Sequence, residues 1–170
     1  MPTDQIAQAL ISVLKQSNGD EPYWADYAAK AQKYLNRPAF HGTPITGKML
    51  ADANLNAYNK YGRLTPLHLA LAQGQFETKL GTNSSGRPNY RSNPYNVGEF
   101  DSGTKMKFGN TTEGLQAYFD LMAKDYLRKK TMWNLLDSFT NNRGNRYASD
   151  PEYETKIRGQ VDYIKKFLGE

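Results

Sequence analysis

The sequence predicts a mainly α-helical domain of the α+β class, in which one irregular or β-containing segment interrupts the helices. Three observations support this prediction. The chain has 170 residues and is 38% hydrophobic, which is enough for one domain with a substantial core. Apolar residues recur at helical spacing through most of the chain. The segment from Thr82 to Phe108 differs, because it is rich in Gly, Asn, Ser, Pro and Tyr.

Residues 1–40 are expected to contain two short helices. An apolar pattern at helical spacing precedes the turn-forming stretch SNGDEP, and a second helix is expected from Pro22 to Leu35. The stretch NRPAFHGTP, residues 36–44, then contains two prolines and a glycine, which break both helical and strand patterns. We therefore predict a helical N-terminal extension, residues 1–40, followed by the main domain, residues 41–170.

Two further helices are predicted from signals at both of their ends. Thr46 can cap the first helix, and Gly62 suits the left-handed residue that follows its last turn. Thr65 can cap the second helix, with Pro66 at the first helical position, where a missing N–H costs nothing. This second helix should end before Gly81.

The segment of residues 82–108 is too long for a plain loop, so a small β-hairpin or an ordered binding loop is predicted there. Three helices should complete the domain. Asn110, with Glu113 three residues later, resembles a capping box at the start of the first. A short helix is expected around Trp133, and the last helix should follow Asp150, an N-cap residue next to a proline.

Composition and charge limit the classes of function. The formal net charge of +5 suggests a polyanionic partner, which could be nucleic acid, an anionic membrane or a bacterial cell wall. The chain has no cysteine, so disulfides, thiolate zinc sites and cysteine nucleophiles are excluded, and only His41 and His68 offer imidazole groups. No apolar run reaches about 18 residues, and the start MPTDQIAQAL lacks the features of a secretory signal. We expect no metal ion or other cofactor.

One carboxylate, Glu77, lies in the otherwise apolar stretch LALAQGQFETKLG. On a helix, Glu77 shares a face with Ala70, Gln73 and Gly74. Two of these neighbours are small, and a glycine inside a helix costs roughly 1 kcal/mol relative to alanine. The pattern therefore predicts open space beside the carboxyl group, as on the floor of a cleft.

The position of Glu77 also predicts an unusual acidity. The negative end of the helix dipole and the apolar surroundings both disfavour ionisation. A carboxyl group that stays protonated near neutral pH can act as a general acid toward a leaving oxygen. The alternative is a solvated glutamate that pairs with Lys79 or Lys105.

Three stretches that follow one another in order carry a family resemblance. They are ITGKMLADANLNAYNKYGRLTPLHLALAQGQFETKLG from Ile45, NPYNVG from Asn93 and YASDPEYETKI from Tyr147. Over about residues 41–168 the chain resembles the glucosaminidase domains of glycoside hydrolase family 73. Gln73, Glu77 and Gly81 match the family's helix, which leads to the catalytic acid.

The resemblance implies a lysozyme-like fold, with a helical lobe and a small β-hairpin or loop flap, and makes residues 41–170 a glucosaminidase catalytic domain. The implied activity is hydrolysis of β-1,4 glycosidic bonds in the glycan strand of peptidoglycan, of the N-acetylglucosaminidase type. Glu77 would be the general acid. The residues implied to bind the substrate are Gln73, Tyr95, Asn96 and Tyr147.

The stretch GEFDSG contains two candidates for a second catalytic carboxylate. Glu99 and Asp101 are the candidates, because they follow the turn that faces the cleft in the family. The turn NPYNVG has one residue more than the family's, so the register is open, and both acids could be ordinary hairpin charges. A substrate-assisted reaction would need neither of them.

Two alternatives remain. A goose-type lysozyme or a lytic transglycosylase would share the fold and the helix glutamate, although these families usually follow the acid with Gly-Leu-Met-Gln, where this chain has NPYNVG. A non-catalytic cationic module that binds cell wall or nucleic acid would use the tyrosines of RPNYRSNPYNVGEF as stacking surfaces. We favour the hydrolase, expected to be a monomer that acts on the bacterial cell wall, with no nucleic-acid or membrane partner. With no signal peptide recognised, we expect delivery by a phage virion or by holin-dependent release.

Overall fold

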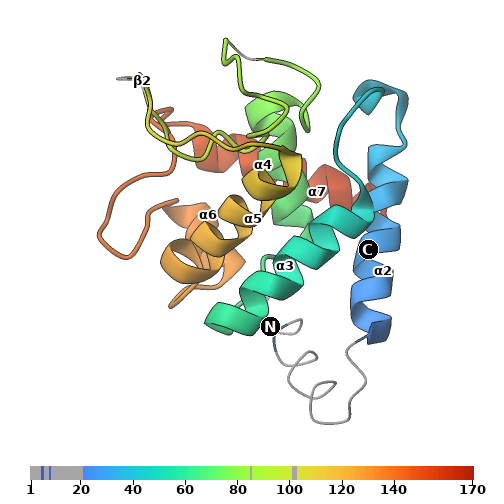
Figure 1. The fold of residues 1–170 in the computed structure, drawn as a ribbon. Helices are drawn as coiled ribbons and strands as arrows, with labels where there is room; N and C mark the ends of the chain where they lie inside the picture. Colours follow the sequence, from blue (N-terminus) through green and yellow to red (C-terminus); the bar gives the residue numbers. More distant parts are fainter. Residues whose placement is uncertain (1–4, 6–7, 9–20, 85, 101–102) are drawn as a thin grey trace.

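The computed structural model describes residues 5, 8, 21–84, 86–100 and 103–170, and it confirms the prediction that the chain is mainly helical (Figure 1). The α-helices are α2 (Glu21–Leu35), α3 (Gly47–Tyr61), α4 (Leu67–Thr78), α5 (Thr111–Leu121), α6 (Met132–Asp137) and α7 (Tyr153–Phe167). A 3-10 turn, η1 (Pro38–Phe40), follows α2, and a π-helical segment, η2 (Met122–Tyr126), continues α5. The helix expected before SNGDEP lies almost entirely outside the described residues. Within these ranges, none of the helices is long and apolar enough to cross a membrane.

Helix α4 forms the centre of the domain. Every residue from Leu67 to Gly74 is buried, so the first two turns of this helix are enclosed on all sides, as their apolar sequence requires. In Figure 1 it passes between the other helices, and it packs against α7 and α2. Glu77 lies in the last turn of this helix, which therefore fixes the position of its backbone.

The predicted caps of α3 and α5 are confirmed. The Thr46 side chain accepts a hydrogen bond from the backbone N–H of Met49, and Gly62 has the left-handed φ of 75° that ends α3. The Asn110 side chain accepts a hydrogen bond from the N–H of Glu113 at the start of α5. These signals are local, and the neighbouring packing does not override them.

The predicted start of α4 is wrong by one residue and that of α7 by two. Pro66 is the N-cap of α4, because Thr65 is held outside the helix: its N–H donates to the Asn54 side chain, and its carbonyl accepts from the same side chain. Helix α7 begins at Tyr153, whereas the Asp150 carboxylate accepts a hydrogen bond in the turn before it. Such shifts at helix ends are common.

The described part of the predicted N-terminal extension belongs to the main core. Trp24, Tyr34 and Phe40 are buried in the same apolar cluster as the side chains of α3 and α4. Helix α2 packs so closely on α3 that a Cβ atom on Gly47 would lie 2.0 Å from the carbonyl oxygen of Ala28. The boundary predicted after residue 40 therefore does not separate two cores.

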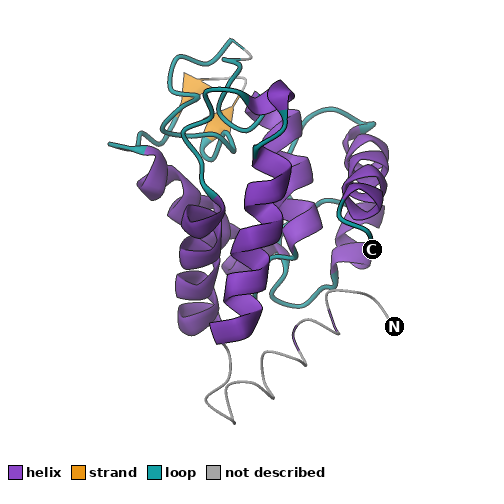
Figure 2. Ribbon diagram, turned by 90° about the vertical axis from the view of Figure 1, so that its right-hand side faces the viewer, coloured by secondary structure: helices purple, strands orange, loops and turns teal. Residues whose placement is uncertain are grey.

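The segment 82–108, which we name the flap, contains the expected small hairpin. Strands β1 (Glu99–Phe100) and β2 (Gly103–Thr104) pair antiparallel, with Glu99 opposite Thr104. In Figure 2 these strands and the loops of the flap lie above one end of the helices. The flap thereby covers the C-terminal end of α4, where Glu77 lies.

Three contacts attach the flap to the helices and to itself. Thr78, at the end of α4, donates its hydroxyl hydrogen to the carbonyl of Pro94 at 2.7 Å. The Asn93 side chain bonds both backbone polar groups of Val97, which closes the NPYNVG turn. Gly114 of α5 lies against the flap backbone, because a Cβ atom there would be 1.9 Å from the Ser92 carbonyl oxygen.

Candidate active site

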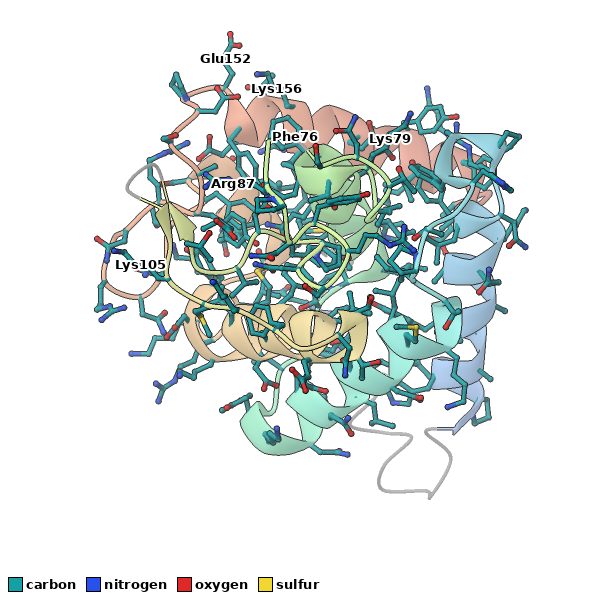
Figure 3. All side chains as sticks on the ribbon, turned by 45° about the horizontal axis from the view of Figure 1, so that its top comes forward. Phe76, Lys79, Arg87, Lys105, Glu152 and Lys156 are labelled. Atoms are coloured by element: carbon teal, nitrogen blue, oxygen red, sulfur yellow. The ribbon has the colours of Figure 1, made fainter. Side chains whose placement is uncertain are left out.

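A cleft of about 330 Å³ lies where the last turn of α4 meets the flap and the loop before α7. Four predicted site residues, from three separate segments of the chain, line it together: Glu77, Asn96, Glu99 and Tyr147. The other lining residues are Arg87, Arg146, Ala148 and Ser149. In the view of Figure 3, the labelled Arg87 of the flap lies near Phe76 of α4, which is the chain neighbour of Glu77.

Glu77 is half-buried, and each of its carboxyl oxygens has one hydrogen-bond donor. The Asn96 side-chain amide donates to Oε2 at 2.8 Å, and the Tyr153 hydroxyl donates to Oε1 at 3.3 Å. Within the described residues Glu77 forms no ion pair, so the alternative pairing with Lys79 or Lys105 is not observed. The carboxyl group is thus oriented by two neutral donors.

Burial raises the pKa of Glu77 above its usual value of 4.5, because surroundings of low polarity disfavour the charged form. The hydrogen bonds from Asn96 and Tyr153 and the positive charge of Arg87 lower the pKa, but they do not cancel the effect of burial. A carboxyl group with a raised pKa retains its proton to higher pH. This is the property that general acid catalysis requires.

Gln73 does not reach the cleft, and the prediction that it binds substrate directly is wrong. Its side chain is completely buried, where its amide donates to the Tyr153 hydroxyl at 3.1 Å and its carbonyl accepts from the Tyr118 hydroxyl. Buried polar groups need such partners to offset their lost hydration. Gln73 therefore acts on Glu77 indirectly, by fixing the hydroxyl group of Tyr153.

Tyr95 is also completely buried and is likewise not available to a ligand. Its hydroxyl donates to the carbonyl of Ala70 at 2.8 Å, and its ring stacks on Tyr118 with 3.7 Å between centroids. A Cβ atom on Gly74 would lie 3.0 Å from this ring and 2.5 Å from the side chain of Leu80. The small residues of α4 thus make room for Tyr95 and Leu80, and the open space predicted on that face is filled.

Glu99 lies on the flap side of the cleft with one oxygen satisfied and one not. Oε2 accepts from the Arg87 guanidinium at 3.1 Å and from the Thr104 hydroxyl at 2.8 Å. Oε1 is buried and has no hydrogen-bond partner among the described residues. The side chain is only 2% exposed. Asp101, the other candidate for the second carboxylate, lies outside the described residues.

Asn96 carries the second unsatisfied acceptor of the cleft, after that of Glu99. Its amide nitrogen donates to Glu77, whereas its Oδ1 is buried without a partner in the described part of the chain. Its backbone is left-handed, with φ of 52°, a conformation that asparagine tolerates better than most residues. An unpaired buried acceptor is costly, so Asn96 and Glu99 both have the capacity to accept a hydrogen bond from a ligand or water in the cleft.

Tyr147 combines packing with a place in the cleft. Its hydroxyl donates to the backbone carbonyl of Tyr95 at 2.9 Å, and its ring stacks on Tyr153 and meets the edges of Tyr126 and Phe139. The residue is half-buried and lines the cleft. Its position is therefore fixed by aromatic contacts, and part of its surface remains free for a ligand.

Sequence reasoning missed Tyr153, Arg87 and Arg146 as site residues. Tyr153 is completely buried at the start of the last helix, and helical spacing gives no sign of its bond to Glu77. Arg87 and Arg146 lie in irregular segments, where no periodicity places a side chain. Arg146 is held by an ion pair with Glu154 at 2.7 Å.

In the described ranges, no three histidine, aspartate or glutamate side chains gather closely enough to hold a metal ion. No protein-family model matches the chain, and a search of curated proteins finds no match.

Proposed function

We propose that the protein is a peptidoglycan hydrolase with a lysozyme-like fold, which cleaves β-1,4 glycosidic bonds of the glycan strand in the manner of an N-acetylglucosaminidase. The observation that carries this proposal is the half-buried Glu77 in a cleft that also contains the carboxylate of Glu99. Burial raises the pKa of Glu77. Glycosidases commonly use such a pair of acids. The net charge of +5 suits an anionic cell wall.

In this mechanism Glu77 donates its proton to the oxygen of the leaving sugar. The Asn96 amide and the Tyr153 hydroxyl then stabilise the carboxylate that forms, because both already donate to its oxygens. They also hold the carboxyl group in one orientation before the reaction. Gln73 supports this arrangement through its hydrogen bond to Tyr153.

Glu99 is the described candidate for the second carboxylate, and Asp101 is the other. The bonds from Arg87 and Thr104 fix one oxygen of Glu99, which leaves Oε1 to accept a hydrogen bond. That oxygen could take a proton from the attacking water. In a substrate-assisted reaction it would instead accept from the N–H of the substrate's acetamido group.

The decisive experiment compares the wild-type protein with Glu77→Gln on isolated bacterial peptidoglycan. We expect the wild type to release fragments with N-acetylglucosamine at their reducing ends, detected by borohydride reduction and mass spectrometry. The variant should be slower by about 10² to 10⁴, the usual contribution of a general acid. Glu152→Gln, the same change at an exposed glutamate outside the cleft, is the matched control.

Other outcomes would replace this proposal. Fragments that end in non-reducible anhydro-muramic acid would assign the protein to the lytic transglycosylases. Peptidoglycan that is bound but stays intact would indicate a cationic binding module. Equal rates for the wild type and Glu77→Gln would remove Glu77 from the mechanism. Delivery by a phage virion or by a holin-dependent route remains part of the proposal and would be tested by locating the protein in purified virions.

A further inference from the structure

A second groove of about 350 Å³ joins the cleft of Glu77. The two share four lining residues, Asn96, Glu99, Arg146 and Tyr147, so they form one continuous depression. The second groove extends along the flap to the loop between α6 and α7. A ligand that occupies the cleft therefore has room for a branch on this side.

Two cations in the groove have no ion pair and no side-chain hydrogen bond in the described part of the chain. Lys105 follows β2, and in the view of Figure 3 it lies on the other side of Arg87 from Phe76. Arg143 comes from the loop between α6 and α7. Neither side chain forms an ion pair or a hydrogen bond with a described residue. Both are exposed and free to bind an anionic group.

The remaining charges of the groove nearly balance one another. Arg146 pairs with Glu154, and Glu99 pairs with Arg87 at 3.1 Å. Asp125 is the only other acid that lines the groove among the described residues. The two positive charges of Lys105 and Arg143 therefore face one unpaired negative charge, that of Asp125, and the groove has a net positive charge.

The wall of the groove is also partly apolar. Met106 is 45% exposed, and Val97 and Leu121 lie beside it among the lining residues. Asn141 and Asn145 add amide groups from the α6–α7 loop. Free cations, amides and an exposed thioether together match a short peptide with carboxylates and methyl groups better than they match an unsubstituted sugar.

We propose that this groove binds the stem peptide of peptidoglycan while the glycan strand occupies the cleft, an inference that rests on the proposed function. Lys105 and Arg143 pair with carboxylates of the stem, and Asp125 accepts hydrogen bonds from its amide or amino groups. Met106 contacts its alanine methyl groups. Stem peptides branch from the muramic acid residues of the strand, which explains a groove that joins the catalytic cleft from the side.

The test compares two substrates, intact peptidoglycan and glycan strands from which an amidase has removed the stems. The measured quantity is the ratio of kcat/KM on the first substrate to kcat/KM on the second. We expect the wild type to prefer the substrate with stems. The double variant Lys105→Ala/Arg143→Ala should lose about tenfold or more of this preference, mainly through a higher KM.

A matched control separates stem recognition from general attraction to the wall. Arg128→Ala/Lys129→Ala removes the same two residue types and the same charge, at exposed positions outside both depressions. It should retain the wild-type ratio. An equal drop in both double variants, or an unchanged ratio in Lys105→Ala/Arg143→Ala, would overturn the proposal.

A binding measurement distinguishes failure of this inference from failure of the proposed function. If the wild type cleaves neither substrate, the proposed hydrolase activity is wrong, and titration calorimetry with soluble muramyl tripeptide still tests the groove. Heat of binding to the wild type that the control retains and Lys105→Ala/Arg143→Ala loses would support the stem site. Absence of binding to the wild type, or equal binding to all three proteins, would overturn it.

Discussion

The two walls of the cleft differ in how completely their polar groups are bonded within the chain. On the helical wall, the oxygens of Glu77, the hydroxyl of Tyr153 and both amide atoms of Gln73 have partners. On the flap wall, Asn96 Oδ1 and Glu99 Oε1 are buried and lack donors among the described residues. The helical wall therefore determines where the acid lies, whereas the flap wall keeps hydrogen-bonding capacity for a ligand.

Backbone conformation reflects the same division. Helix α4 is regular up to Thr78, and then Lys79 and Leu80 adopt left-handed φ values of 51° and 55° in the turn that leads to the flap. Asn96, which bonds Glu77 from the flap, has a positive φ as well. Such residues store strain that the surrounding contacts must offset, and they concentrate at functional sites. The flap is thus placed by a few strong contacts rather than by regular secondary structure.

The largest effect is expected from breaking one of those contacts with Gly114→Ala. The new Cβ atom would lie 1.9 Å from the Ser92 carbonyl oxygen and 3.2 Å from the Asn93 Cα, so α5 and the flap backbone must separate. We expect a loss of about 3 kcal/mol in the free energy of unfolding, measured by denaturant titration. Gly159→Ala, in a helix with open space at that position, is the control and should not destabilise the protein. A stable Gly114→Ala variant would show that the flap is not anchored there.

A smaller effect is expected from Glu99→Gln, which changes the carboxylate of the flap wall whose Oε1 lacks a donor among the described residues. If Glu99 acts as the base, kcat should fall by about 10², whereas the melting temperature should change little. Arg87 would keep an oxygen acceptor in the variant, so the fold of the flap should persist. Full activity of Glu99→Gln together with inactivity of Asp101→Asn would move the role to Asp101. Full activity of both would favour a substrate-assisted reaction.

Sequence alone predicts the elements well because their signals are local. The caps at Thr46 and Asn110 and the stop at Gly62 are decided by hydrogen bonds over three or four residues, and the structure has all three. The exception at Thr65 has a nonlocal cause, since Asn54 of the preceding helix binds both of its backbone polar groups. Local signals thus fail where a buried side chain competes for the same backbone atoms.

The site could be predicted only in part. The apolar setting of Glu77 and the order of the three stretches are visible in the sequence, and Glu77, Asn96, Glu99 and Tyr147 do meet at one cleft. Which face of α4 is open is not visible there, because Tyr95 fills the space beside Gly74 from a distance of 21 residues along the chain. Spacing identifies small residues but does not show what they accommodate.

A pair of variants compares the two walls through the pKa of Glu77. Asn96→Gly removes one donor and retains a residue that suits a left-handed backbone, whereas Tyr153→Phe removes the other donor. Both hydrogen bonds lower the pKa of Glu77, so either change should raise that pKa further. The acid must be protonated to act, and the high-pH limb of the activity profile should therefore move to higher pH in both variants.

The two variants should differ in stability. Tyr153→Phe leaves the buried Gln73 amide without its acceptor, which we expect to cost about 1–3 kcal/mol. Asn96→Gly removes an amide whose oxygen already lacks a partner, so its cost should be smaller. Thermal unfolding and pH–rate profiles of the same two proteins provide the measurement. Equal losses of stability would contradict the contrast between a fully bonded wall and an incompletely bonded one.

The smallest effect concerns the stability of Glu77→Gln, and it needs no substrate. Because burial raises the pKa of Glu77, the folded protein holds this proton more tightly than the unfolded chain does. The resulting stabilisation is fully present below the usual glutamate pKa of 4.5 and is lost as pH rises through the higher pKa of the folded state. Glutamine has no proton to lose. The melting temperature of Glu77→Gln relative to the wild type should therefore rise with pH and level off above the folded-state pKa. Thermal scans from about pH 3 to about pH 8 measure it, with Glu152→Gln as the control for loss of a surface carboxylate. A difference that is independent of pH would show that the helical wall does not perturb the acid.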